Sequence, residues 1–202
     1  MRRGVANPLR GLQPDAAYVR SVVDSLPGPV VIAGHSYGGS VMTEAADGAA
    51  NVAALVYIAS FNLDVGESTG ELAAKFPGAQ LGSVLDAVPF PGGTDLYIQQ
   101  DRFNEIFAGD VAPDVAKLMA ATQRPIAANA LEDRATKAAW KTIPSWTMVT
   151  LGDLAIPADS MRFMAERAGS TTIEIDASHA VTVSQPEAVA DFIDTAARSV
   201  AG

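Results

Sequence analysis

Ser36 is the first residue of this sequence whose setting could support catalysis, because it lies in the stretch Gly34-His35-Ser36-Tyr37-Gly38. A serine hydroxyl becomes a nucleophile when a neighbouring base takes its proton. The residues before the stretch are apolar and β-branched, as in a buried strand, and those after it are typical of a helix. This context predicts a tight turn, in which Gly34 and Gly38 let strand and helix approach and the serine Oγ is exposed at the carboxyl end of a sheet. The competing interpretation is a glycine-rich connection with a surface serine.

The sequence contains two histidines, so the choice of a base for Ser36 is narrow. His179 lies in the stretch IDASHAV, directly after a predicted strand, and a loop there opens at the carboxyl end of the sheet. We predict it as the general base. Alternatively, it is a loop histidine that binds local backbone. His35 precedes the nucleophile, and the geometry of the turn predicts that it points away from Oγ and helps to line the substrate site.

A carboxylate is needed to fix the tautomer of the base and to stabilise the imidazolium. Asp153 follows another predicted strand, so we predict it as the acid, although a solvated turn aspartate is the simpler interpretation. Asp176, three residues before His179, and Asp159, within a predicted helix, are rivals. The backbone N–H of Tyr37, at the start of the helix after the nucleophile, is predicted to stabilise an oxyanion.

Strands and helices alternate along the chain in a way that brings these side chains to one edge of a sheet. Four short apolar segments predict strands buried on both faces, and helical segments precede or follow them. The pattern predicts an α/β fold in which helices cover both faces of a parallel sheet. The predicted strands are 28–34, 51–60, 144–152 and 171–176, and the predicted helices are 13–28, 40–48, 157–169 and 186–200.

Residues 62–140 break this alternation and are predicted to form a cap insertion within a single domain of residues 1–202. The stretch 76–95 is rich in proline and glycine and is predicted to be a loop. The stretch 113–131 has a helical pattern that is interrupted near Pro125. The insertion is expected to roof the site at the carboxyl ends of the strands.

Composition argues against several classes of protein. The 202 residues are 49% apolar and 18% charged, as in a globular domain, and the net charge of −9 argues against nucleic acid or an anionic membrane as partner. The absence of cysteine excludes disulfides and thiolate metal sites. We find no signal peptide and no apolar run that would span a bilayer, so a cytoplasmic protein is the default expectation.

The stretches GHSYGG, GDLAIP, DASHAV and SQPEAVADFI resemble the α/β-hydrolase fold family. The resemblance is strongest to small bacterial esterase-like members related to the plant methyl-esterase and hydroxynitrile-lyase group. GTDLYI and MAATQRP resemble pieces of the cap in that group, so the resemblance extends over nearly the whole chain. It implies Ser36 as nucleophile, Asp153 as acid and His179 as base, with no metal and no organic cofactor.

The resemblance starts part-way into the family's fold. The family normally places several strands and a helix before the nucleophile strand, and one of those strands ends in an HG loop that donates a second oxyanion N–H. Only 29 residues precede Val30, and RRGVANP is interpreted as the tail end of an earlier strand, so one edge of 30–33 is expected to lack a partner. A truncated chain or misassigned start, a homo-oligomer paired through this edge, and an N-terminal segment that covers it are the explanations left open.

The motifs predict a serine hydrolase that cleaves a small ester through an acyl-enzyme on Ser36. His35, Phe61, Tyr97 and Leu118 are expected to contact this substrate. Other apolar residues of the insertion either bind it as well or form the core of the cap. They are Leu85, Phe90, Leu96, Phe103, Phe107 and Met119.

Two other functions are compatible with the sequence. One is a lyase that uses the same triad, as the related hydroxynitrile lyases do. In those enzymes a cap lysine assists cyanide, and Lys117 and Lys137 lie in the insertion here, although no lysine stands beside Asp153. The other is a non-catalytic or weakly active hydrolase fold, which is suggested by the short segment before the predicted nucleophile strand.

Overall fold

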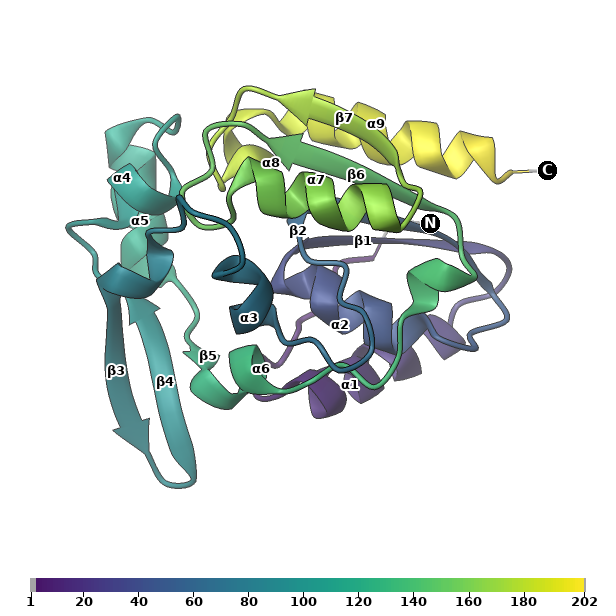
Figure 1. The fold of residues 1–202 in the computed structure, drawn as a ribbon, viewed down its shortest axis with the longest axis horizontal. Helices are drawn as coiled ribbons and strands as arrows, with labels where there is room; N and C mark the ends of the chain where they lie inside the picture. The colour runs from purple at the N-terminus through teal and green to yellow at the C-terminus, as the bar shows by residue number, and fades with distance from the viewer. Residues whose placement is uncertain (1–2, 202) are drawn as a thin grey trace.

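Four parallel strands form the central sheet of the protein, whose computed structural model describes residues 3–201. They lie across the sheet in their order along the chain, and each is within two residues of its predicted start (Figure 1). The two middle strands are buried along almost their whole length, because sheet neighbours and helices surround them. The strands are β1 (Val30–Ser36), β2 (Val52–Ser60), β6 (Ser145–Thr150) and β7 (Thr171–Ile175).

Helices cover both faces of this sheet, as the alternation of the sequence predicts. In Figure 1, α2 and α7 lie in front of the sheet and α9 lies behind it, and α1 packs against α2. Helix α1 ends four residues earlier than predicted, because the chain turns at Ser25 before it reaches Pro27 and Gly28. The bounds are α1 (Leu12–Asp24), α2 (Tyr37–Ala46), α7 (Ala158–Arg167), α8 (Val181–Ser184) and α9 (Pro186–Ser199).

β1 is the last strand on one side of the sheet, since among the described residues it pairs only with β2. The expected unpaired edge is therefore present in this part of the chain. The segment 3–9 contains no strand, so its interpretation as the tail end of a strand is wrong for the residues described. It continues into a turn at Leu9, which has a φ of +63°, and then into α1.

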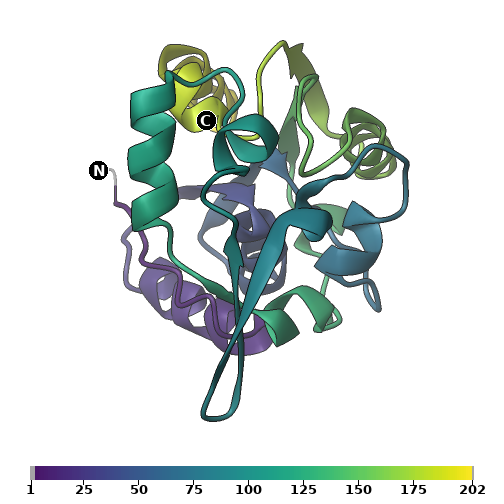
Figure 2. The ribbon, with the colours of Figure 1, turned by 90° about the vertical axis from the view of Figure 1, so that its left-hand side faces the viewer.

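The insertion between β2 and β6 lies beyond the carboxyl ends of the sheet strands, toward which the arrows of β6 and β7 point in Figure 1. Figure 2 views the molecule from this side and shows the insertion in front of the sheet. Its elements are short, and three of them form a small antiparallel sheet in the order β3-β4-β5. They are α3 (Thr69–Ala73), η1 (Leu81–Val84), β3 (Leu85–Phe90), β4 (Gly93–Ile98), α4 (Phe103–Phe107), α5 (Pro113–Thr122), β5 (Ile126–Ala127), α6 (Ala128–Glu132) and η2 (Ala139–Lys141).

The prediction of a loop over 76–95 is wrong, because β3 and the first half of β4 form a hairpin there. Gly92, with a φ of +101°, allows the tight turn between the two strands. Pro89 is tolerated because β3 is an edge strand and needs no N–H donor on its open side. The predicted break near Pro125 is confirmed, since α5 ends at Thr122 and β5 begins at Ile126.

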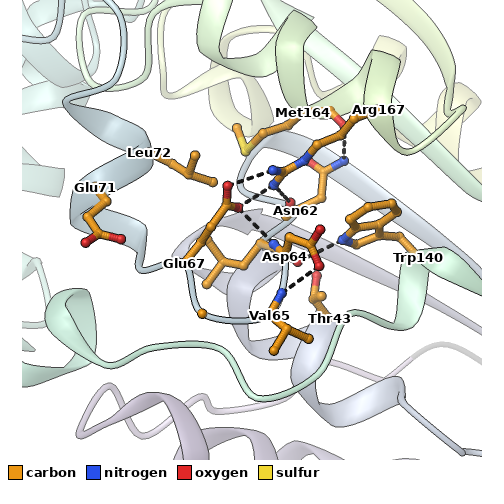
Figure 3. Close-up of polar contacts among 12 residues, drawn as sticks. Thr43, Asn62, Asp64, Val65, Glu67, Glu71, Leu72, Trp140, Met164 and Arg167 are labelled. Atoms are coloured by element: carbon orange, nitrogen blue, oxygen red, sulfur yellow. Dashed lines mark hydrogen bonds and ion pairs between the residues drawn. The ribbon is translucent and has the colours of Figure 1, made fainter.

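Arg167, at the end of α7, ties three separate segments together (Figure 3). Its guanidinium donates two hydrogen bonds to the Glu67 carboxylate, at 2.7 and 2.5 Å, and a third to the Asn62 carbonyl at 2.7 Å. The same group lies over the rings of Trp140 and Phe163, 5.5 and 5.1 Å from their centroids. The loop after β2, the end of α7 and η2 are thereby held in one arrangement.

Glu67 is the acidic partner in this network. Its partial burial alone would raise the pKa of the carboxyl group, but the hydrogen bonds from Arg167 and from the Asp64 amide outweigh burial and hold that pKa below its usual value. The carboxylate is therefore charged at neutral pH, and it depends on Arg167 for compensation of that charge.

No helix in the described part of the chain combines the length and the apolar character that a membrane span requires.

Replacing Arg167 by Met keeps an unbranched apolar stem but leaves the Glu67 charge without its cation. We expect a loss of about 1–3 kcal/mol in the free energy of unfolding, measured by urea titration. The matched control is Arg162→Met on the same helix, because Arg162 forms exposed pairs with Asp159 and Glu174. If both variants unfold at the same urea concentration, the network contributes no more than a surface ion pair.

Candidate active site

The turn at Ser36 joins β1 to α2 and has a φ of +53°, which residues other than glycine rarely adopt. Gly34 permits the turn, because a Cβ there would lie 2.7 Å from the backbone of Gly38. Gly39 is equally constrained, since its Cβ would lie 2.0 Å from Ser60 Oγ. A Cβ at Gly38 would meet open space, so Gly34 and Gly39, and not Gly38 as predicted, allow strand and helix to approach. The predicted strand-turn-helix geometry is present.

Ser60, the last residue of β2, braces this turn from the neighbouring strand. Its buried hydroxyl donates a hydrogen bond of 2.6 Å to the Ser36 carbonyl, and the two residues are register partners in the sheet. The sequence analysis did not identify Ser60, because a serine at the end of an apolar strand gives no signal that separates it from any other strand end.

Ser36, His179 and Asp153 form a continuous chain of hydrogen bonds, although Ser36 and His179 are 143 residues apart. The Nε2 atom of His179 lies 2.8 Å from Ser36 Oγ, and its Nδ1 atom lies 2.7 Å from Asp153 Oδ2. These distances fit a neutral imidazole that donates its Nδ1–H to the carboxylate and accepts the serine proton at Nε2. The three residues come from the carboxyl ends of β1, β6 and β7, as the sequence predicts.

The Asp153 carboxylate is buried and fully engaged. Oδ1 accepts the backbone N–H groups of Ala155 and Ile156, both at 2.8 Å, and Oδ2 accepts the Thr150 hydroxyl at 2.8 Å. Burial alone would raise the pKa of Asp153, but the attraction of His179 and these hydrogen bonds outweigh burial and hold that pKa below its usual value. A carboxylate that is charged at neutral pH can orient the base and stabilise its protonated form.

The two rival aspartates have other positions. Asp159 lies in the first turn of α7 and pairs with Arg162 at 2.9 Å. Asp176 directly follows β7 and is three residues from the base. Of the three aspartates considered, Asp153 is the one whose carboxylate reaches His179.

Tyr37 opens α2, so its backbone N–H lies next to the nucleophile and has no partner within the helix. Such an N–H group carries a partial positive charge and can stabilise an oxyanion. The side chain points elsewhere, since its hydroxyl donates a hydrogen bond of 3.0 Å to the buried Asp15 of α1. Burial and the neighbouring Asp15 charge raise the pKa of Tyr37, so the side chain remains a neutral donor.

His35 contacts the loop that carries the base, and not the nucleophile. Its Nε2–H donates to the backbone carbonyl of His179 at 2.8 Å, and the two rings lie 4.7 Å apart. Burial, and then repulsion by His179, lower the pKa of His35 to about 4. His35 is therefore a neutral donor at physiological pH, and it also forms part of the wall of the cavity described next.

A cavity of about 1290 Å³ opens beside Ser36 and continues along the unpaired edge of β1. Its far end lies between α1 and α9, where Val22 and Ile193 contribute to its wall. The end nearest the nucleophile is roofed by apolar residues of the insertion. They are Leu81, Leu85, Leu96, Ile98, Phe103, Phe107 and Met119.

Three of the predicted substrate contacts lie outside the wall of this cavity. Phe61 is buried in the main core, Leu118 is 64% exposed on α5, and Tyr97 lies on β4. The expectation that they contact the substrate rested on apolar character alone, which does not distinguish the two faces of a strand or helix. The cap lysines Lys117 and Lys137 are also exposed and outside the cavity wall.

Residues 3–201 contain no group of three histidines, aspartates or glutamates placed to hold a metal ion.

The low pKa of His35 makes stability depend on pH. Below about pH 6.5 the unfolded chain protonates this histidine, whereas the folded protein resists protonation until about pH 4. The free energy of unfolding should therefore decrease as the pH falls through this window. His35→Gln keeps an N–H donor without a titrating group. Between pH 7 and pH 4 we expect the free energy of unfolding of this variant to fall by about 1–3 kcal/mol less than that of the parent protein.

Urea unfolding of both proteins across this pH range measures the difference. His179 is present in both proteins, so the difference between them reports His35 together with its repulsion by His179. Identical slopes for the two proteins would show that His35 titrates normally in the folded state.

Comparison with known proteins agrees with the fold and with the family resemblance of the sequence. A family model described as the alpha/beta hydrolase family matches residues 3–192. The alpha/beta hydrolase nvfD of Aspergillus novofumigatus is 28% identical over 180 residues, which are 83% of this chain and 70% of that protein.

Solved structures share the fold. Polyneuridine aldehyde esterase is similar with a TM-score of 0.75 at 16% identity, covering 94% of this chain and 80% of that chain. A pyrethroid hydrolase from Sphingobium faniae has a TM-score of 0.70 at 21% identity, covering 93% and 79%. A methylesterase from Arabidopsis has a TM-score of 0.70 at 17% identity, covering 96% and 80%. The predicted α/β-hydrolase core is thus confirmed, and with a family match over 3–192 the chain belongs to the alpha/beta hydrolase family.

Proposed function

We propose that this protein is a serine hydrolase that cleaves a small carboxylic ester through an acyl-enzyme on Ser36. One observation carries the proposal, namely the chain of hydrogen bonds from Ser36 Oγ through His179 to the buried Asp153, at 2.8 and 2.7 Å. A part-buried serine on a strained turn, an oriented base and a buried carboxylate support acyl transfer. The likeness to proteins named as esterases supports the ester as substrate class.

The reaction follows from this arrangement. Ser36 Oγ attacks the ester carbonyl carbon while His179 Nε2 takes the hydroxyl proton, and the tetrahedral oxyanion faces the backbone N–H of Tyr37. The bond from the carbonyl carbon to the alcohol oxygen then breaks, and His179 returns its proton to the alcohol. Water repeats these steps on the acyl-enzyme, which releases the acid and restores Ser36.

The roof of the cavity supports an ester with an apolar group. Seven apolar side chains of the insertion line the end nearest Ser36, and the His35 imidazole there is neutral. None of these seven side chains offers a counter-charge to a substrate carboxylate or ammonium, and the charged residues of the cavity wall are Arg3, Arg124 and Asp194. We therefore expect alkyl or aryl esters to be preferred over charged ones.

A cyanohydrin lyase is the less supported alternative. The lysine that such a reaction would use to assist cyanide has no counterpart in the cavity wall, since Lys117 and Lys137 are exposed away from it. Release of cyanide from an aromatic cyanohydrin, with no hydrolysis of esters, would favour the lyase over the esterase.

Removing members of the triad should abolish turnover of p-nitrophenyl butyrate while the fold persists. We expect Ser36→Ala and His179→Ala each to lower kcat by about 10⁴-fold and Asp153→Asn by about 10³-fold. The double variant of Ser36 and His179 should be little worse than either single one, because the residues act as a unit. The matched control is Asp176→Asn, and a large loss there with little loss in Asp153→Asn would reassign the acid.

A fluorophosphonate probe tests the nucleophile without knowledge of the substrate. Only an activated serine should react, so we expect one label per chain on Ser36, located by peptide mass spectrometry, and none in His179→Ala. A folded protein that remains unlabelled would favour the non-catalytic alternative.

A further inference from the structure

The loop that carries His179 is held by contacts with other segments, because residues 176–180 form no helix or strand of their own. On one side, His35 donates to the His179 carbonyl at 2.8 Å. On the other side, the insertion supplies the contacts. The Ala180 N–H donates to the Phe107 carbonyl at 3.0 Å, and the Phe107 ring meets the His179 ring edge-on at 4.7 Å.

Asp110, in the turn between α4 and α5, binds this loop directly. Its Oδ2 atom accepts the Ser178 amide N–H at 3.0 Å, and its Oδ1 atom accepts the Ser178 hydroxyl. The Ser178 oxygen in turn shares the Ala180 N–H with the Phe107 carbonyl and accepts it at 3.2 Å. Because the hydroxyl proton points to Asp110, a lone pair is left to face Ala180. One carboxylate thus fixes the residues on both sides of His179.

The apolar contacts agree with the polar ones. Ala180 is buried in a small hydrophobic cluster whose other members all belong to the insertion. Ala180 thereby joins the loop of the base to the core of the cap, while Ala177, on the other side of His179, packs in the main core of the domain. The other members are Phe103, Ala108, Val111, Ala116 and Ala120.

We infer that Asp110 is a positioning residue that holds His179 in line with Ser36, so that the cap sets the position of the base as well as roofing the cavity. The inference rests on the proposed function, because it assigns a role within that triad. Asp110 lies 68 residues before Ser178, and nothing in its sequence setting marks it for this role. At neutral pH it is ionised, because its bonds from Ser178 outweigh the effect of partial burial and hold its pKa below the usual value.

Asp110→Asn tests the inference with little change of shape. Its amide offers one acceptor oxygen where the carboxylate offers two, so one donor of Ser178 faces an NH₂ group. We expect kcat for p-nitrophenyl butyrate to fall by about 10- to 100-fold, since small displacements of a base are costly, and KM to change by less than about threefold. The matched control is Asp114→Asn, an exposed carboxylate in the first turn of α5, which should leave both constants unchanged.

Ser178→Ala approaches the same contact from the other partner. It should lower kcat to a similar degree, and the double variant with Asp110→Asn should lose less than the product of the two single losses. Independent, fully multiplicative losses would mean that the two residues act through different contacts, and the inference would fail.

A spectroscopic measurement separates positioning from loss of the fold. Histidine-selective ¹⁵N labelling gives signals from two side chains, and the His179 Nδ1 proton should resonate far downfield because it is bonded to a carboxylate. We expect this signal to broaden or move upfield in Asp110→Asn and to stay unchanged in Asp114→Asn. A fall in kcat that only tracks a lower thermal midpoint, with the Nδ1 signal intact, would overturn the inference.

The two proposals can fail separately. If the parent protein hydrolyses esters and labels with fluorophosphonate, but Asp110→Asn behaves like Asp114→Asn, the role of Asp110 is wrong and the esterase stands. If the parent protein neither hydrolyses nor labels, the esterase is wrong, and the Nδ1 signal alone decides whether Asp110 positions His179.

Discussion

The strained turn at Ser36 is the constraint on which the rest of the site depends. A positive φ at a residue with a side chain is unfavourable, and it persists only where the surroundings leave no alternative. Gly34 and Gly39 remove the side chains that would separate strand from helix, and Ser60 ties the Ser36 carbonyl to the neighbouring strand. The base and the carboxylate can then reach an Oγ atom whose position is already set by the backbone.

Parallel strands explain how residues so distant in sequence meet. Each connection returns the chain to the same starting end of the sheet, so the loops after β1, β6 and β7 all lie at the carboxyl ends of the strands. This shared end of the sheet brings Asp153 and His179 near Ser36, but it does not align their side chains. Alignment comes from buried hydrogen bonds, those around the Asp153 carboxylate and those that hold the His179 loop between β1 and the insertion.

The insertion and the unpaired edge of β1 together shape the cavity. The cap covers the end near Ser36 with apolar side chains, while the other end follows the strand edge between α1 and α9. A parallel sheet usually has neighbours along both edges of a buried strand. Here β1 is only half-buried, and the segment 3–9, which contributes to the cavity wall, forms no strand beside it.

Short-range patterns determined the sheet, the flanking helices and the identity of the three residues that meet at its edge. Apolar runs, glycine spacing and a count of two histidines can be recognised in the sequence without knowledge of the tertiary structure. The tertiary structure decided what depends on contacts between distant segments. A hairpin is present where proline and glycine predicted a loop, and it tolerates Pro89 because that residue lies on an open strand edge. Phe61, Tyr97 and Leu118 lie outside the cavity wall. The tertiary structure also selected Ser60, His35 and Asp110 as supports of the site, since a hydrogen bond across 68 or 144 residues leaves no trace in local sequence.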